Sequence, residues 1–369
     1  MSFHVQKSRL LHVDLLKAAA AQMIVLHHLS AYGPIAQAVE SWLPHLMQAL
    51  YHYGRLAVQV FLVVGGFLSA RALSSRGQPL DASVPTLLWR RYRRLVLPFM
   101  AAVLLTLACS LLVEPWLPEL TPQSVSFQQL LAHGLLLQDV LGFESLTVGA
   151  WYVAMDLQLF ATLLALLWVA RSLLPARGLG QGRRLLRILM APLLVLALCM
   201  ASLFVFNRDA SLDAWALYFF GAYGLGALVH WFGLSPQRRL GLGLMTCLVV
   251  AALALEFRER AALALLTALA LAWWQRRHEL GLPALRRGGA LVAQLGNHSY
   301  ALFLVHFPVC LLINAVFAHQ GLSSAGAGLA FLLAAWALSN LAAMAFYRWV
   351  EVPSGRLRLV HLLPRLTTS

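Results

Sequence analysis

The chain has 369 residues, of which 60% are hydrophobic and only 11% are charged, and its mean hydropathy is +0.74. Soluble globular proteins carry roughly 25% charged residues, so the composition excludes an ordinary soluble protein and indicates a membrane protein with several spans. The net charge of +14 does not indicate nucleic-acid binding, because the basic residues occur in short clusters between hydrophobic segments.

Ten hydrophobic segments follow one another along the chain. We therefore predict an all-α polytopic membrane protein with about ten transmembrane helices, forming a single membrane-embedded domain over residues 1–369 without a separate soluble domain. The N-terminal sequence lacks the small-residue cleavage site of a removable signal peptide, so we expect none. The predicted spans are 11–32, 54–73, 95–113, 150–172, 188–206, 213–232, 239–255, 259–275, 298–318 and 325–350.

The first span carries a polar stripe on an otherwise apolar helix. At 100° per residue, Lys17 and His28 point within about 20° of the same direction and lie about 16 Å apart along the axis. Asp14 lies within about 60° of both, whereas His27 points about 80° away from Lys17. Because charged side chains are costly against lipid, the stripe should face protein or a water-filled cavity. Two end charges reaching the headgroups and one hydrogen-bonded histidine are the alternative interpretation.

Most of the 28 lysines and arginines lie on alternate connections between the predicted spans. The positive-inside rule therefore places these connections, and both termini, in the cytoplasm. The connection 114–149 contains four acidic residues and no lysine or arginine, so it should lie outside. Within it, the apolar stretch 127–141 predicts an interfacial or re-entrant helix. The opposite connections hold few basic residues, namely Arg55, Arg208, Arg258 and Arg260.

This orientation sorts the polar residues of the spans into two layers. Asp156 is expected about 7–8 Å below the outer end of the fourth span, at the depth of His28, with His306 nearer the middle. A carboxylate beside an imidazole makes a suitable general base, so we expect Asp156 to orient His28. Arg91 and Arg94, at the cytoplasmic edge, suit the phosphates of a soluble donor. The alternatives are a helix-terminal carboxylate, a hydrogen-bonded core histidine and ordinary arginine anchoring.

The four cysteines all fall within predicted spans and show no CxxC or Cys/His metal spacing. We therefore expect buried, unreactive thiols and no metal site. They are Cys109, Cys199, Cys247 and Cys310.

Six short motifs occur in order along the chain. The first comprises Asp14, Lys17 and His28, and the others are VFLVVGGFLSA (60–70), RYRRLVLP (91–98), WYVAMDLQLF (151–160), SYALFLVHFPV (299–309) and YRWVEVP (347–353). Together they resemble the motifs of the acyltransferase-3 family of integral membrane acyltransferases. Three positions depart from the family pattern: Lys17 replaces an arginine, Gly65 a serine and Asp156 a glutamate. A serine acyl-enzyme at position 65 is therefore impossible.

The resemblance implies a bacterial inner-membrane O-acyltransferase that moves acetyl from acetyl-CoA to a hydroxyl of a cell-surface or exported glycan. It implies His28 as the catalytic histidine, with Asp156 beside it, and a donor site at Arg91, Arg94 and Lys17. Residues expected to support the substrates or the structure are Asp14, Trp151, Gln158, Tyr300, His306, Arg348 and Glu351.

The expected partners are thus an acyl-CoA donor, a glycan acceptor and the lipid bilayer, without a metal or nucleic acid. A transporter or flippase for a glycan precursor is the alternative, although the two halves of the chain show no internal repeat. A structural or sensory membrane subunit is a third possibility, which the motifs do not favour.

The arginine asymmetry makes a topology prediction. Cysteines introduced into segments 71–94 and 171–187 should react with an impermeant thiol reagent only from the cytoplasmic side, and a cysteine at residue 130 only from the outside. The measurement is accessibility labelling in a background without the four native cysteines. Labelling of residue 130 only from the cytoplasm would contradict the orientation.

Overall fold

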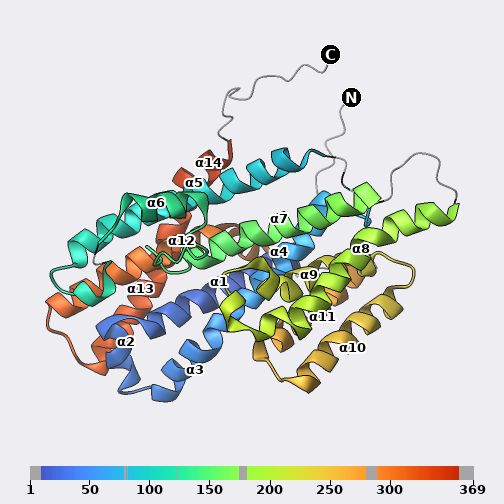
Figure 1. Cartoon of the computed structure of the whole chain (residues 1–369). Helices are drawn as coiled ribbons and strands as arrows, with labels where there is room; N and C mark the ends of the chain where they lie inside the picture. Colours follow the sequence, from blue (N-terminus) through green and yellow to red (C-terminus); the bar gives the residue numbers. More distant parts are fainter. Residues whose placement is uncertain are drawn as a thin grey trace, which may run out of the picture.

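A computed structural model describes residues 10–78, 80, 82–122, 124–173, 181–279 and 289–356. These residues form helices joined by turns, without a strand among them (Figure 1). The predicted all-α class is therefore confirmed. The predicted location of both termini, and of several basic clusters, concerns residues 1–9, 174–180, 280–288 and 357–369, which lie outside the described residues.

In the described residues, seven helical segments are long and apolar enough to cross a membrane. They are Pro44–Leu73, Val84–Val113, Ala150–Leu173, Ile188–Arg208, Arg238–Leu255, Gly289–His319 and Ala325–Gly355. The other three predicted spans coincide with α1 (Leu11–Ala31), α9 (Ala216–Gly233) and α11 (Glu259–Glu279). The chain is thus a multi-pass membrane protein, while the count of about ten spans stays a prediction.

Long apolar segments form helices here because, in lipid, each backbone N–H and C=O must find its partner within the segment. The principal helices are α4 (Val58–Leu73), α5 (Val84–Val113), α7 (Ala150–Leu173), α8 (Gln181–Phe204), α10 (Arg238–Leu255), α12 (Gly289–His319) and α13 (Ala325–Phe346). Shorter ones are α2 (Gly33–Glu40), α3 (Pro44–Gly54), α6 (Phe127–Leu135) and α14 (Val352–Arg356). Figure 1 shows α2 and α3 together at one end of the bundle.

Helix α12 organises the part of the bundle that matters for the site. It packs against α1, α5 and α13, and one unbroken run of its residues, 301–308, is buried. Helices α4 and α9 pack closely at Gly66 and Gly226. A Cβ atom at Gly66 would overlap the carbonyl oxygen of Tyr223, and one at Gly226 would overlap that of Val63. Only glycine permits so close an approach of the two backbones.

The connection 114–149 contains α6, at the position where an interfacial or re-entrant helix was predicted. In α6, Nδ1 of His133 lies 2.8 Å from the carbonyl oxygen of Gln129. Nε2 of the same ring accepts a hydrogen bond of 3.0 Å from the N–H of Leu146. Burial lowers the pKa of His133, which keeps the imidazole neutral and able to accept at Nε2. The segment also folds back on α5, because Tyr92 donates to the carbonyl of Gly134.

Helices α5 and α12 extend further toward their N-terminal ends than the predicted spans. Helix α5 begins at Val84 instead of 95, so Arg91 lies inside it, and α12 begins at Gly289 instead of 298. The relative depth of His28 and His306 in the membrane stays a prediction.

The prediction of four buried thiols is also wrong at one position. Cys109, Cys199 and Cys310 are buried, whereas Cys247 is exposed on α10.

Candidate functional site

The polar residues singled out in the sequence gather in three clusters. The histidine pair consists of His28 and His306. The ion-pair cluster consists of Arg91 and Asp156, with Gly65 beside them. The Lys17 cluster consists of Asp14, Lys17, Arg94 and Glu351.

The histidine pair joins α1 to α12. Nδ1 of His28 and Nε2 of His306 lie 2.8 Å apart, and Nδ1 of His306 lies 3.1 Å from the carbonyl oxygen of Leu302. The two rings are nearly parallel, at an interplanar angle of 22°. Both side chains are buried, His28 being 9% and His306 1% exposed. The pair is therefore a buried imidazole chain that ends on a backbone carbonyl.

His27 occupies a different environment from its neighbour. It faces α3, where its ring lies 5.6 Å from that of Tyr51 and where Gly54 packs against it. Its Nδ1 atom is buried without a hydrogen-bond partner in the described structure. The predicted rotation between the two histidines thus corresponds to two separate packing partners.

The ion-pair cluster joins α5 to α7. The guanidinium of Arg91 donates from Nε to Asp156 Oδ2 at 3.0 Å and from Nη2 to Oδ1 and Oδ2 at 2.7 Å each. The side chains are 26% and 8% exposed. Asp156 therefore does not orient His28, because its carboxylate is held by Arg91 instead.

Gly65, the position where the family usually has serine, lies against this ion pair. A Cβ atom there would lie 3.3 Å from Cε2 of Tyr223 and 3.9 Å from Oδ1 of Asp156. The hydroxyl of Tyr223 donates to Ser69 Oγ at 2.8 Å, and Arg91 lies 5.3 Å from the ring centroid of Phe160. The segment 60–70 and the Arg91 and Asp156 motifs thus meet at one centre.

Two other residues of the Asp156 motif have structural roles. Gln158 donates to the carbonyl of Ala214 and accepts the N–H of Ala216, each at 3.1 Å, so it holds α7 to the start of α9. Trp151 packs against Phe219 of α9, with ring centroids 5.5 Å apart.

The Lys17 cluster lies at the other end of the α1 stripe from His28. Lys17 Nζ is 3.7 Å from Asp14 Oδ1, and Glu351 interacts electrostatically with both Lys17 and Arg94. The Lys17 side chain is 26% exposed, and Arg94 is exposed on α5. Two cations, Lys17 and Arg94, thus lie near two carboxylates, Asp14 of α1 and Glu351 of the C-terminal segment. Both cations are at least partly accessible to a ligand.

Glu351 ends a π-helical turn, Tyr347–Glu351, that also carries the exposed Arg348. The N–H of Val352 bonds to the carbonyl of Tyr347, and the next residue, Pro353, has no N–H for an α-helical bond. Single π-helical turns often mark functional sites, because they redirect side chains within a helix.

One face of α12 connects the three clusters. Tyr300 donates to the carbonyl of Leu95 at 2.9 Å and interacts electrostatically with Asp156 and Glu351. The ring of Phe303 lies 5.2 Å from that of Tyr152 and 6.3 Å from that of His306. Since residues three apart share a helix face, Tyr300, Phe303 and His306 form a continuous row.

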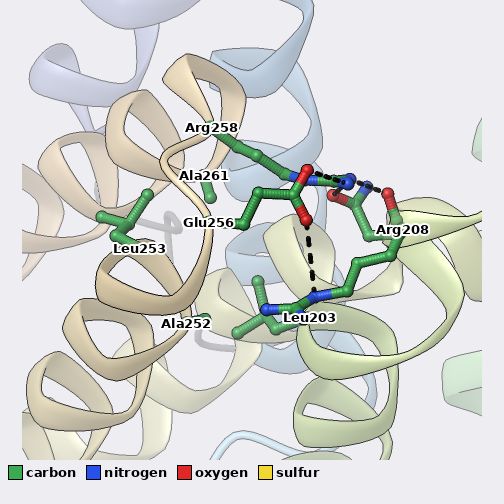
Figure 2. Close-up of a pocket in the computed structure, with 8 residues that line it drawn as sticks. Leu203, Arg208, Ala252, Leu253, Glu256, Arg258 and Ala261 are labelled. Atoms are coloured by element: carbon green, nitrogen blue, oxygen red, sulfur yellow. Dashed lines mark hydrogen bonds and ion pairs between the residues drawn. The ribbon is translucent and has the colours of Figure 1, made fainter.

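A separate charged cluster lines a pocket between the end of α8 and the α10–α11 connection. Figure 2 shows Arg208 and Arg258 converging on Glu256, at 3.8 and 2.6 Å. Arg258 also donates to Asn207. Two of the four basic residues on the opposite connections, Arg208 and Arg258, therefore have a carboxylate partner. These ion pairs join the end of α8 to the α10–α11 connection.

The profile of the acyltransferase-3 family, described as an acyltransferase domain, matches residues 10–348. The chain therefore belongs to this family, which implies that it is a membrane acyltransferase. The comparisons with curated proteins and with solved structures find no match.

The buried ion pair makes a stability prediction. Arg91→Ala and Asp156→Ala each leave one charge unpaired, so each should lower the free energy of unfolding by about 3–5 kcal/mol. The double variant should lose clearly less than the sum of the two, because the charges are coupled. Denaturant unfolding in detergent micelles measures this, with Arg90→Ala, an exposed neighbour, as the matched control. Strict additivity would show that the pair contributes no coupling.

Proposed function

We propose that the protein is an O-acetyltransferase of the bacterial inner membrane. It takes acetyl from cytoplasmic acetyl-CoA and transfers it to a hydroxyl of a cell-surface or exported glycan. The observation that carries the proposal is the α1 stripe, which has the half-buried Lys17 beside the exposed Arg94 of α5 at one end and the buried His28 at the other. Family membership favours this enzyme over the transporter or flippase alternative.

The Lys17 cluster is the proposed docking site for the phosphates of coenzyme A. Lys17 and Arg94 come from different helices and reach the same place, as their shared interaction with Glu351 indicates. Arg91, which was expected to share this role, is instead committed to Asp156 by a bidentate contact. We therefore assign Arg91 to positioning of the site rather than to phosphate binding.

His28 is the proposed general base. It lies about 16 Å along α1 from Lys17, which leaves room for the pantetheine arm between bound phosphates and the reacting thioester. His28 takes the proton of the acceptor hydroxyl while the oxygen attacks the acetyl carbonyl. The new C–O bond forms, the C–S bond breaks, and the proton passes from His28 to the departing coenzyme A thiolate.

The donor site can be tested by binding. Lys17→Ala and Arg94→Ala should each weaken coenzyme A binding by about 1.5–3 kcal/mol, because each removes a charge-assisted phosphate contact. Lys17→Arg should keep the affinity, since it restores the residue usual in the family. Isothermal titration calorimetry on the detergent-solubilised protein measures this, with Arg76→Ala, an exposed cation of the α4–α5 connection, as control. Parental affinity in both alanine variants would exclude this donor site.

The base can be tested with acetyl-labelled acetyl-CoA and an isolated cell-envelope fraction as acceptor. His28→Ala should lower incorporation of label by about 10²–10⁴-fold, the usual contribution of a general base. His27→Ala should lower it far less, because His27 packs against α3. Both variants should keep coenzyme A affinity and membrane expression. Near-parental transfer by His28→Ala, or no transfer by the parent, would overturn the proposed function.

A further inference from the structure

The histidine pair has a direction, which its end on the carbonyl of Leu302 determines. A carbonyl oxygen only accepts hydrogen bonds, so Nδ1 of His306 must carry the hydrogen in the 3.1 Å contact with that oxygen. A neutral imidazole has one N–H and one lone pair. Nε2 of His306 is therefore an acceptor, and it accepts from Nδ1 of His28, 2.8 Å away.

The same tautomer occurs in an unambiguous setting elsewhere in the chain. His133 bonds through Nδ1 to the carbonyl four residues earlier, and its Nε2 accepts a backbone N–H that can only donate. His28 also interacts with the carbonyl four residues earlier, that of Ile24. The tautomer of His28 therefore follows from its contact with Nε2 of His306.

Both rings must be neutral for this chain of hydrogen bonds to hold. Burial favours neutral imidazoles, because an imidazolium would lose its hydration without gaining a counter-ion. The carboxylate that was expected beside His28 is held by Arg91 instead. The histidine pair is therefore a chain of two neutral imidazoles, and the free lone pair is on Nε2 of His28.

We propose that His306 is a positioning residue that fixes His28 in the Nδ1–H tautomer, so that Nε2 of His28 is the atom that takes the acceptor proton. The inference rests on the proposed function and deepens it. The direction of the chain also excludes the reverse assignment, in which His306 is the base, because Nδ1 of His306 is occupied by a backbone carbonyl. As the proton arrives at Nε2 of His28, its Nδ1–H keeps donating to His306, which stabilises the imidazolium that forms.

Two matched variants separate this role from simple packing. In His306→Gln, the side-chain carbonyl oxygen is as many bonds from Cβ as Nε2 of histidine and can accept from His28. In His306→Asn, the amide reaches only the place of Nδ1, so it can bond to Leu302 but cannot reach His28. Should His306→Asn fail to fold, His306→Phe keeps a ring and removes both nitrogens.

The assay is transfer of label from acetyl-CoA to the cell-envelope fraction, measured beside coenzyme A affinity and unfolding in detergent. His306→Gln should stay within about tenfold of the parent, whereas His306→Asn should lose about 10²-fold or more, because a wrong histidine tautomer costs up to about 10⁴-fold in a catalytic triad. All variants should bind coenzyme A with parental affinity, since the Lys17 cluster is remote from His306.

Each outcome decides between the two proposals. Parental activity in both His306 variants, or equal impairment of both, would overturn the positioning role while leaving His28 as the base. Retained transfer by His28→Ala would overturn the proposed function itself. Loss in His28→Ala and His306→Asn with rescue by His306→Gln is the result that supports the inference.

Discussion

The contact between Arg91 and Asp156 is the constraint on which the centre of the molecule depends. Either charge alone among apolar helices would be costly, so each side chain holds the other in place. The contact fixes α5 against α7, and it brings Gly65 of α4 and Tyr223 of α9 to the same point. Four helices thus meet at one pair of charges, and α12 packs against one of them, α5.

Helix α12 contacts α1 at both ends of the candidate site, near the Lys17 cluster and at the histidine pair. It lies parallel to α1, with Gly296 packed against Asp14 and His306 against His28. The absence of a side chain at Gly296 lets the two helices approach closely near the Lys17 cluster. Near the other end, the contact between the helices is made by the two imidazoles. The distance between cations and base is therefore set by helix geometry and not by a flexible loop, as a site that positions its reactants requires.

Much of this arrangement could be predicted from the sequence, and the exceptions have a common cause. Hydropathy located the helices, and the 100° rotation per residue separated His28 from His27 correctly. Hydropathy does not detect helical turns that extend beyond the apolar core, and α5 and α12 both begin in such turns. The predicted placement of Arg91 and Asp156 in separate layers was wrong, since the two side chains form an ion pair. The partner of Asp156 could not be predicted, because a sequence pattern gives no distance between helices.

The three departures from the family pattern fall within the clusters that the structure brings together. Lys17 keeps a positive charge but not a planar fork, and its 3.7 Å contact with Asp14 is that of a point charge. Asp156 is shorter than glutamate, yet it keeps a bidentate contact, because the long side chain of Arg91 spans the distance from α5. Gly65 removes a side chain at the place where Asp156 and Tyr223 approach α4. Each departure therefore preserves the sign of charge or the close packing at its position while it changes reach, and none of them touches the histidine pair.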